Sequence, residues 1–293
     1  MITCNLIGGL GNQLFQIFTT ISYAIRTKQK FVFFKTDKTG GGMTKIRDTY
    51  WNNLLYKLAP FLIVNLPTYN LIREISFTYN DIISEIINYT EKNTHVCLYG
   101  YFQSYKYFQN NFNTIYRMLD FEKQKETVSQ IFSKHYLENA VSLHFRIGDY
   151  KLFPKIYPIM SYEYYEKALL HIEKNNSNFL QILFFCEDED LDEVNIIIEK
   201  LKSRFQNNSF NRAPNTLKDW EQMLLMSCCT YNVIANSSFS WWGAYLNTNC
   251  NKIVCYPETW FVNGANETWF VNGTNSRDLC PSEWVKISNI YNI

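Results

Sequence analysis

The chain has 293 residues, and 46% of them are hydrophobic, which is typical of globular proteins and excludes an intrinsically disordered chain. Its 28 basic and 27 acidic residues leave a net charge of +1, so no strong charge field attracts nucleic acid or an anionic membrane. Eight cysteines without a C-x-x-C spacing argue against a disulfide scaffold and against a zinc ribbon.

The amino terminus has no basic stretch followed by an apolar core, and no window approaches the ~18 continuous apolar residues that cross a bilayer. We therefore expect a cytoplasmic protein with no transmembrane segment and no nucleic-acid partner, for which peripheral membrane association stays open. Without an export signal, the Asn-x-Ser/Thr sequons are interpreted as accidents of an Asn-rich chain. These sequons begin at Asn88, Asn175, Asn207, Asn236, Asn266 and Asn272.

The first segment predicts a strand, a helix and a second strand. An apolar run from Ile2 to Ile7 is followed by a glycine turn, an amphipathic run from Gln13 to Arg26 and the apolar Phe31–Phe34. This β-α-β pattern predicts a parallel sheet.

A second set of alternating strands and helices follows later. Its expected elements are a strand at Ala140–Arg146, a helix at Ser161–Glu173, a strand at Phe179–Phe185 and a helix at Asp188–Phe205. Two such sets predict an α/β fold of two Rossmann-like domains, residues 1–137 and 138–293, facing each other across a cleft. Residues 65–113 have no clear helix caps, and the tandem nine-residue repeat in 258–275 is interpreted as a duplication in a surface loop.

A glycine-rich turn lies directly between the first predicted strand and helix. Its sequence, Gly8-Gly-Leu-Gly-Asn-Gln13, is not the full G-x-G-x-x-G fingerprint, so a tight turn without a ligand competes with a phosphate or sugar contact. Asn12 and Gln13 favour the contact, because they place amide donors at the carboxyl end of a strand, where open sheets bind ligands.

Three polar residues alternate along the strand that starts near Ala140. Ser142, His144 and Arg146 share one face, with apolar residues on the other. His144 is either a hydrogen-bonded structural histidine or a catalytic one. Arg146 points to an anion such as a diphosphate, because its planar fork suits phosphate oxygens. Asp149 is either its salt-bridge partner or a carboxylate that takes a proton from an attacking hydroxyl.

A hydroxyl-rich turn follows the apolar segment Asn232–Ala235 and opens a predicted helix. Hydroxyl and N–H groups at such a turn suit phosphate oxygens, whereas Trp241 and Trp242 are interpreted as core residues. The acidic Glu187–Asp190 segment raises a metal hypothesis through Asp188 and Asp190, but an acidic first turn of a helix explains it as well. We expect no metal.

Five segments together resemble the α1,2-fucosyltransferases, which use GDP-L-fucose. They are Gly8–Gln16, Gly100-Tyr-Phe-Gln-Ser104 with Tyr107-Phe108, His144-x-Arg146-x-Gly-Asp-Tyr150, Leu225-Met-Ser227 leading into Asn236–Leu246, and Asp278-Leu-x-Pro281 with Trp284. They occur in the family's order and span nearly the whole chain.

The resemblance implies a GT-B fold and an inverting, metal-independent transfer of L-fucose from GDP-β-L-fucose to the 2-hydroxyl of a terminal galactoside. GDP-fucose is then a co-substrate, no cofactor is needed, and the partners are the donor and a galactose-terminated glycan. The first domain is the implied acceptor side and the second the GDP-sugar side. The implied catalytic residues are His144, Arg146 and Asp149, and the implied donor-binding residues are Asn12, Gln13, Arg146, Ser237, Ser238, Phe239 and Ser240.

The sequence departs from the family pattern at two points near the proposed site. Ile147 stands where many relatives carry a second arginine, and Cys186-Glu-Asp188 replaces a usual Ser-Asp-Asp. Two alternatives stay open beside fucosyl transfer: another GDP-hexose as donor, and a non-catalytic glycan-binding protein that stacks its 7 Trp and 21 Tyr on sugars.

Overall fold

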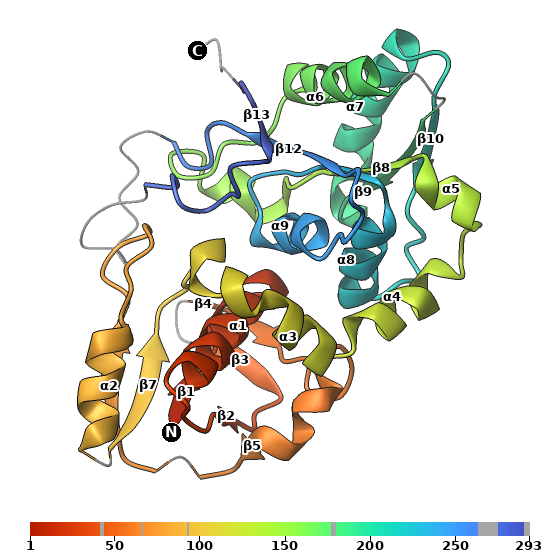
Figure 1. The fold of residues 1–293 in the computed structure, drawn as a ribbon. Helices are drawn as coiled ribbons and strands as arrows, with labels where there is room; N and C mark the ends of the chain where they lie inside the picture. The colour runs from red at the N-terminus through yellow and green to blue at the C-terminus, as the bar shows by residue number, and fades with distance from the viewer. Residues whose placement is uncertain (42–43, 66, 93, 177–179, 263–274, 290–293) are drawn as a thin grey trace. The chain divides into compact units, whose positions relative to one another are not determined.

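The structure is a computed structural model that describes residues 1–41, 44–65, 67–92, 94–176, 180–262 and 275–289. The described chain divides into two compact units (Figure 1). The first comprises Met1–Lys123 and the described residues 275–281, and the second comprises 124–262 and 282–289. The boundary between domains 1–137 and 138–293, with the role of each domain, stays a prediction.

The first unit is built on a parallel three-stranded sheet in the order β1-β7-β6, with residues Ile2–Cys4, His95–Tyr99 and Tyr69–Arg73. Helix α1, Leu10–Arg26, follows β1 and is buried along most of its length. Arg26 in its last turn complements the helix dipole. The other strands and helices are β2 Phe33–Phe34, β3 Lys38–Gly41, β4 Thr44–Asp48, β5 Leu62–Ile63, α2 Ile83–Glu91, α3 Phe112–Met118 and α4 Phe121–Ser129, which runs into the second unit.

The second unit contains a six-stranded sheet in which all neighbouring strands are parallel. Its order is β10-β9-β8-β11-β12-β13, so the first strand in sequence, β8, lies in the middle. This is the Rossmann order 3-2-1-4-5-6, whose direction of winding reverses between β8 and β11. The strands are β8 Ala140–His144, β9 Gln181–Phe185, β10 Ser209–Arg212, β11 Tyr231–Val233, β12 Ile253–Pro257 and β13 Val285–Ile287.

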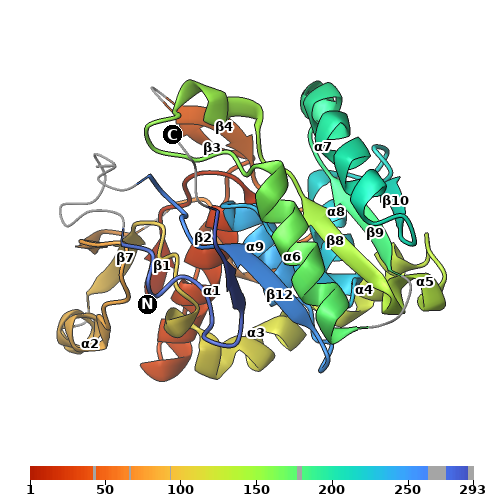
Figure 2. The same cartoon turned by 90° about the horizontal axis from the view of Figure 1, so that it is seen from above.

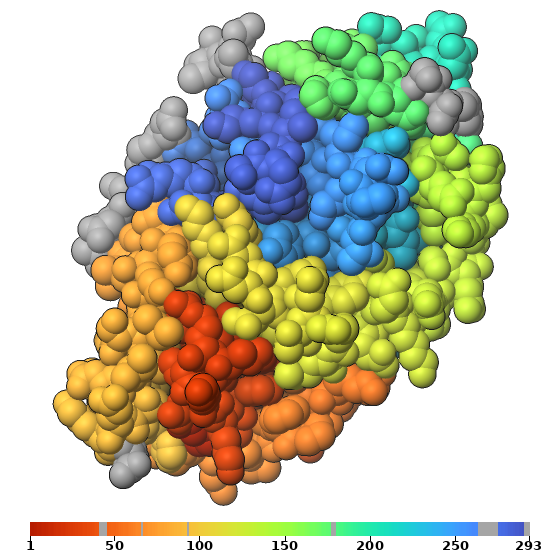
Figure 3. Space-filling model, in the orientation of Figure 1, coloured from red at the N-terminus to blue at the C-terminus, as the bar shows by residue number. Residues whose placement is uncertain are grey.

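Helices cover both faces of this sheet, with α6 and α7 on one face and α8 and α9 on the other (Figures 1 and 2). Helix α5 lies on the surface in Figure 3. The helices are α5 Lys134–Glu138, α6 Tyr162–Asn175, α7 Leu191–Arg204, α8 Asp219–Cys228 and α9 Ser238–Tyr245. The prediction of an α/β fold with parallel sheets is therefore confirmed.

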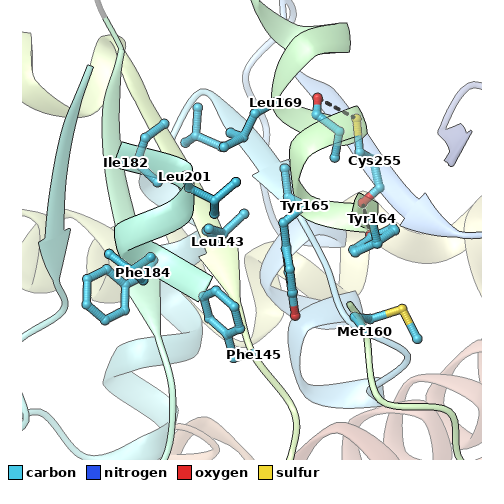
Figure 4. Close-up of a cluster of buried hydrophobic side chains, with 14 of the residues drawn as sticks. Leu143, Phe145, Met160, Tyr164, Tyr165, Leu169, Ile182, Phe184, Leu201 and Cys255 are labelled. Carbon is cyan, nitrogen blue, oxygen red and sulfur yellow. Dashed lines mark hydrogen bonds between the residues drawn. The ribbon is translucent and has the colours of Figure 1, made fainter. Parts of the chain in front are cut away.

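The main core of the second unit lies between the sheet and helices α6 and α7 (Figure 4). Val141, Leu143 and Phe145 project into it, and the Phe145 ring centroid lies 4.3 Å from that of Tyr165 on α6. Ser142 on the opposite face accepts a 2.7 Å hydrogen bond from Asn232 of β11. The alternation predicted for this strand is confirmed.

Helices α8 and α9 pack closely on the other face. Trp241 and Trp242 of α9 are fully buried, which confirms their interpretation as core residues. Gly243 lies against α8, because a Cβ atom built on it would stand 2.8 Å from Cβ of Met226. A glycine is needed here for the close approach of the two helices.

Several elements differ from the prediction at their ends. Strand β1 ends at Cys4 and helix α1 begins at Leu10, because the intervening residues form the glycine turn. The region without readable caps contains β6, α2 and β7. Most of the tandem repeat, residues 263–274, lies outside the described residues. In the described part of the chain, no helix is both long and apolar enough to cross a bilayer.

Candidate active site

The candidate site lies where the winding of the six-stranded sheet reverses. Strands β8 and β11 are neighbours, with Leu143 paired to Val233 near their carboxyl ends. The loop after β8 carries Arg146 and Asp149, and the loop after β11 carries the hydroxyl-rich turn that begins at Asn236. Open α/β sheets bind their ligands at this kind of switch point.

Arg146 is held by three side chains at the carboxyl edge of the sheet. It donates to Glu187 over 2.5 Å and to Asp149, and its guanidinium lies 4.9 Å from the ring centroid of Tyr150. Burial opposes its charge, but Tyr150 and the two carboxylates outweigh that effect and raise its pKa. Arg146 is therefore a fixed cation. Its partner carboxylates are 38% and 50% exposed, so an incoming anion can compete for the guanidinium.

The loop that follows Arg146 is fixed by a hydrogen bond and an ion pair with Asp190. The buried Asp190 carboxylate accepts a 2.8 Å hydrogen bond from the N–H of Gly148 and lies 3.6 Å from Nζ of Lys151. Asp188 pairs with Arg212. Cations and an N–H thus occupy the two carboxylates of the metal hypothesis, and within the described residues no group of three or more potential ligands gathers. Metal independence stays a prediction.

His144 ends β8 in a buried environment. Burial, followed by the charge of Arg146, lowers its pKa to about 3, so the imidazole is neutral at physiological pH. Its ring centroid lies 5.6 Å from that of Phe239, and its Nδ1 atom has no hydrogen-bond partner in the described structure. The Tyr165 hydroxyl fixes the strand end by donating to the His144 carbonyl over 3.0 Å. A neutral imidazole can donate or accept a hydrogen bond to a ligand but carries no acidic imidazolium proton.

The hydroxyl-rich turn places its serines in different environments. Ser237 caps α9, because its Oγ accepts from the N–H of Phe239 over 3.3 Å. Ser240 is fully buried and donates to backbone carbonyls, so it stabilises the turn. Ser238 is partly exposed at the first position of α9. Helix N-termini with such groups attract anions.

Asn12 and Gln13 lie in the first unit, at the start of α1. Gln13 is fully buried and its Nε2 donates to the carbonyls of Gly8 and Asp48 over 3.1 and 2.9 Å. It therefore holds the glycine turn against β4. Asn12 is half-buried and accepts a 2.8 Å hydrogen bond from Gln103. The contact of either residue with a donor stays a prediction.

Glu187, Asp190 and Tyr150 were not among the predicted site residues. Glu187 and Asp190 were part of the acidic segment interpreted as a helix start, and Tyr150 belonged to the motif around Arg146. Ile147, where the sequence departs from the family pattern it resembles, is 4% exposed and belongs to the core cluster of the second unit. Its apolar side chain therefore supplies core packing and no second cation.

Residues 1–270 match the family described as Glycosyl transferase family 11. The chain belongs to this family. Family 11 membership confirms the resemblance read from the five motifs and establishes the protein as a glycosyltransferase.

Two curated relatives of this family 11 chain come from Escherichia coli. The chain is 33% identical to "O-antigen biosynthesis glycosyltransferase WbnK" over 182 residues, 57% of this chain and 55% of that protein, so the match spans about half of WbnK. It is 26% identical to "Alpha-1,2-colitosyltransferase" over 306 aligned residues, 98% of this chain and 99% of that protein.

Among solved structures, the chain is similar to POFUT1 in complex with GDP-fucose. The TM-score is 0.51 at 8% sequence identity, and the match covers 87% of this chain and 97% of that chain. This likeness concerns the fold alone, and it agrees with the predicted fold of GT-B type.

Proposed function

We propose that the protein transfers L-fucose from GDP-β-L-fucose to the 2-hydroxyl of a terminal galactoside, with inversion at the anomeric carbon. The observation that carries the proposal is the position of Arg146. It follows β8 at the switch point of a Rossmann-ordered sheet, and α9 begins after the neighbouring strand β11. Membership in glycosyl transferase family 11 supports the same reaction class.

The proposed reaction needs the enzyme to stabilise a leaving diphosphate. The acceptor oxygen bonds to the anomeric carbon as the bond from that carbon to the β-phosphate oxygen breaks, and GDP leaves with the bonding electron pair. Negative charge grows on the diphosphate, so Arg146 and the Ser238 hydroxyl stabilise the transition state more than the ground state. The acceptor hydroxyl loses its proton to solvent water in the same step, so the products are the glycoside, GDP and one proton.

Asp149 and His144 take limited parts in this proposal. The Asp149 carboxylate holds the guanidinium of Arg146, which favours a positioning role for it. The neutral His144 ring packs on Phe239 and shapes the floor of the proposed donor site. GDP leaves as an anion and does not have to be protonated by His144. The low pKa of this histidine is therefore compatible with the proposed reaction.

A colitose donor is the second candidate, because the E. coli relative aligned over 98% of this chain is an α1,2-colitosyltransferase. The contacts proposed for the diphosphate are the same for both donors. The difference between them lies in the sugar ring, for which the described residues give no discriminating contact.

One assay tests the function and its rivals. GDP-fucose and GDP-colitose are each offered with lactose and with lacto-N-biose, and the product linkage is read by NMR. An α1,2-linked fucoside supports the proposal, and transfer from GDP-colitose alone supports the second candidate. If the chain binds lactose but neither binds GDP nor transfers a sugar, it is a glycan-binding protein, and both candidates are overturned.

The proposal includes metal independence and a cytoplasmic location. Undiminished turnover in EDTA supports metal independence, and loss of turnover that Mg²⁺ or Mn²⁺ restores contradicts it.

The cytoplasmic location is supported by the burial of Asn236. This residue is 1% exposed, and its Nδ2 donates to the carbonyls of Pro158 and Trp260, both over 3.0 Å. A glycan on the buried Asn236 is incompatible with this fold, which supports the interpretation of this one sequon as accidental.

A further inference from the structure

Glu74 is a buried carboxylate of the first unit that the proposed reaction does not use. It follows directly after β6 and its Oε2 atom accepts hydrogen bonds from the N–H groups of Tyr101 and Phe102, over 2.7 and 2.9 Å. Its other oxygen, Oε1, is buried with no hydrogen-bond partner in the described structure. One side chain thus binds two backbone N–H groups of the loop that follows β7.

This loop, Gly100–Ser104, depends on the close approach of Glu74. A Cβ atom on Gly100 would stand 2.3 Å from Cβ of Glu74 and 2.7 Å from its Oε2, so only glycine fits there. Phe102 is buried and has a φ of 53°, a left-handed conformation that bulky residues rarely adopt. Such a conformation persists only where surrounding contacts impose it.

The loop brings polar groups to the carboxyl edge of the sheet. Gln103 donates to Oδ1 of Asn12 over 2.8 Å, and Ser104 donates to the carbonyl of Asp278 over 2.5 Å. Strand β1 pairs with β7 on one side and bridges to Phe31 on the other. The direction of winding in this unit therefore also reverses between β1 and β7. The Gln103–Asn12 bond lies across that switch point, where a ligand is expected.

We propose that Glu74 is a positioning residue for the acceptor sugar, because its carboxylate fixes the Gly100–Ser104 loop and thereby holds Gln103 and Asn12 in place for sugar hydroxyls. This inference rests on the proposed function, since it assigns the acceptor to the first unit, and it gives Asn12 to the acceptor in place of the donor. The amide groups of Gln103 and Asn12 are donors and acceptors of the type that binds hydroxyls of an uncharged hexopyranoside.

The Glu74 carboxyl does not need its charge for this task. Burial raises its pKa to about 7, although the two N–H donors act in the opposite direction. Glutamine has the same shape and offers a carbonyl oxygen to the same two N–H groups. Glu74→Gln is therefore the conservative variant, and Glu74→Ala removes both hydrogen bonds.

The test compares acceptor and donor parameters in these variants. For Glu74→Ala we expect the KM for the galactoside to rise about tenfold or more, with kcat and the Kd for GDP little changed, because a displaced loop misplaces only the acceptor. Glu74→Gln should restore the KM to within about threefold of the wild type. Asp81→Asn is the matched control, since Asp81 also accepts hydrogen bonds in the first unit, from Tyr23 and the Ile83 N–H. It should leave the acceptor KM unchanged.

Three outcomes overturn the inference: an unchanged acceptor KM in Glu74→Ala, an equal loss of GDP binding, or no rescue by glutamine. If Glu74→Ala does not fold, Gln103→Ala takes its place, and a folded Gln103→Ala with the wild-type acceptor KM overturns the inference as well. An NMR titration with lactose gives the acceptor Kd without turnover. Absence of transfer by the wild type therefore contradicts the proposed function, whereas an unchanged acceptor Kd in the variants contradicts the role of Glu74.

Discussion

The hydroxyl of Tyr150 donates a hydrogen bond to the backbone carbonyl of Asn236 over 2.8 Å. This bond joins the loop after β8 to the loop after β11, on the two sides of the sheet's switch point. The same tyrosine ring lies beneath the guanidinium of Arg146. Tyr150 thus holds the cation and the hydroxyl-rich turn in one arrangement before any ligand binds.

Removing only that hydroxyl tests the arrangement. In Tyr150→Phe the ring stays and the link to Asn236 is lost, which costs about 0.5–1.5 kcal/mol and should raise the KM for the GDP-sugar about threefold to tenfold. Tyr162→Phe is the control, because it removes a part-buried hydroxyl that donates to Glu166 on α6, away from the loop after β11. Steady-state kinetics with varied donor concentration measures the effect, and an unchanged donor KM in Tyr150→Phe would contradict it.

Arg146→Ala should reduce kcat by about a hundredfold to a thousandfold, the usual loss for one preorganised contact to a developing negative charge. The fold should persist, because the two carboxylates released by the change are exposed enough to be hydrated. Arg212→Ala is the matched control, since Arg212 also pairs with a carboxylate, Asp188, in the same unit. Turnover assays and circular dichroism report the two properties, and near-normal turnover in Arg146→Ala removes Arg146 from the mechanism.

Ser238 and Ser240 should respond differently to alanine. Ser238→Ala removes a partly exposed hydroxyl at the start of α9 and should weaken GDP binding about threefold to tenfold, with stability unchanged. Ser240→Ala removes a buried hydroxyl that donates to the carbonyls of Ala235 and Ser237, so it should lower stability more than GDP affinity. Calorimetry with GDP and urea unfolding separate the two. Equal GDP affinity of Ser238→Ala and wild type would exclude a phosphate contact of the Ser238 hydroxyl.

Much of the second unit could be predicted because its signals are local. The alternation of Ser142, His144 and Arg146 with apolar residues fixed which face of β8 meets the core. The order of strands and helices in turn predicted that Arg146 and Ser238 follow parallel strands. Both inferences use only periodicity and chain order, which a sequence carries directly.

The partners of these residues could not be predicted, because they depend on tertiary packing. Glu187 is 41 residues from Arg146 in the chain and meets it only because β8 and β9 pair in parallel. The amide of Gln13, for which a ligand contact stays a prediction, donates to the carbonyl of Asp48, 35 residues away. No local pattern shows that the Asp278 segment returns to the first unit, where its carboxylate bonds to Lys106.

His144 should make the protein sensitive to acid. Its pKa in the folded protein is about 3, whereas an unfolded histidine titrates near its ordinary 6.5. Between these values the unfolded chain binds a proton that the folded protein does not, so stability is complete above about pH 6.5 and falls as the pH decreases. At pH 5 this loss is on the order of 2 kcal/mol.

Urea unfolding of wild type and His144→Gln at pH 7 and pH 5 measures this contribution. The wild type should lose more stability than the variant over this interval, and His135→Gln, which changes an exposed histidine on α5, should behave as the wild type. The pH profile of kcat between pH 6 and 9 should show no inflection due to His144. Equal acid sensitivity of wild type and His144→Gln would mean that His144 has the same pKa in the folded and unfolded protein, which contradicts the prediction.

Gly243→Ala should destabilise the second unit through the contact between α8 and α9. The added methyl would stand 2.8 Å from Cβ and 2.9 Å from Sδ of Met226, and although the sulfur can move, the Cβ atom moves only with its helix. Overpacking of this kind costs about 1–3 kcal/mol, more than alanine gains through its higher helix propensity. Gly9→Ala is the control, because nothing lies within 4 Å of a Cβ atom at Gly9.

Urea unfolding measures the effect. The urea midpoint should fall in Gly243→Ala and stay nearly constant in Gly9→Ala. Since α9 begins at Ser238, a shifted helix should also weaken GDP binding. A Gly243→Ala variant as stable as the wild type would show that the helices separate at little cost.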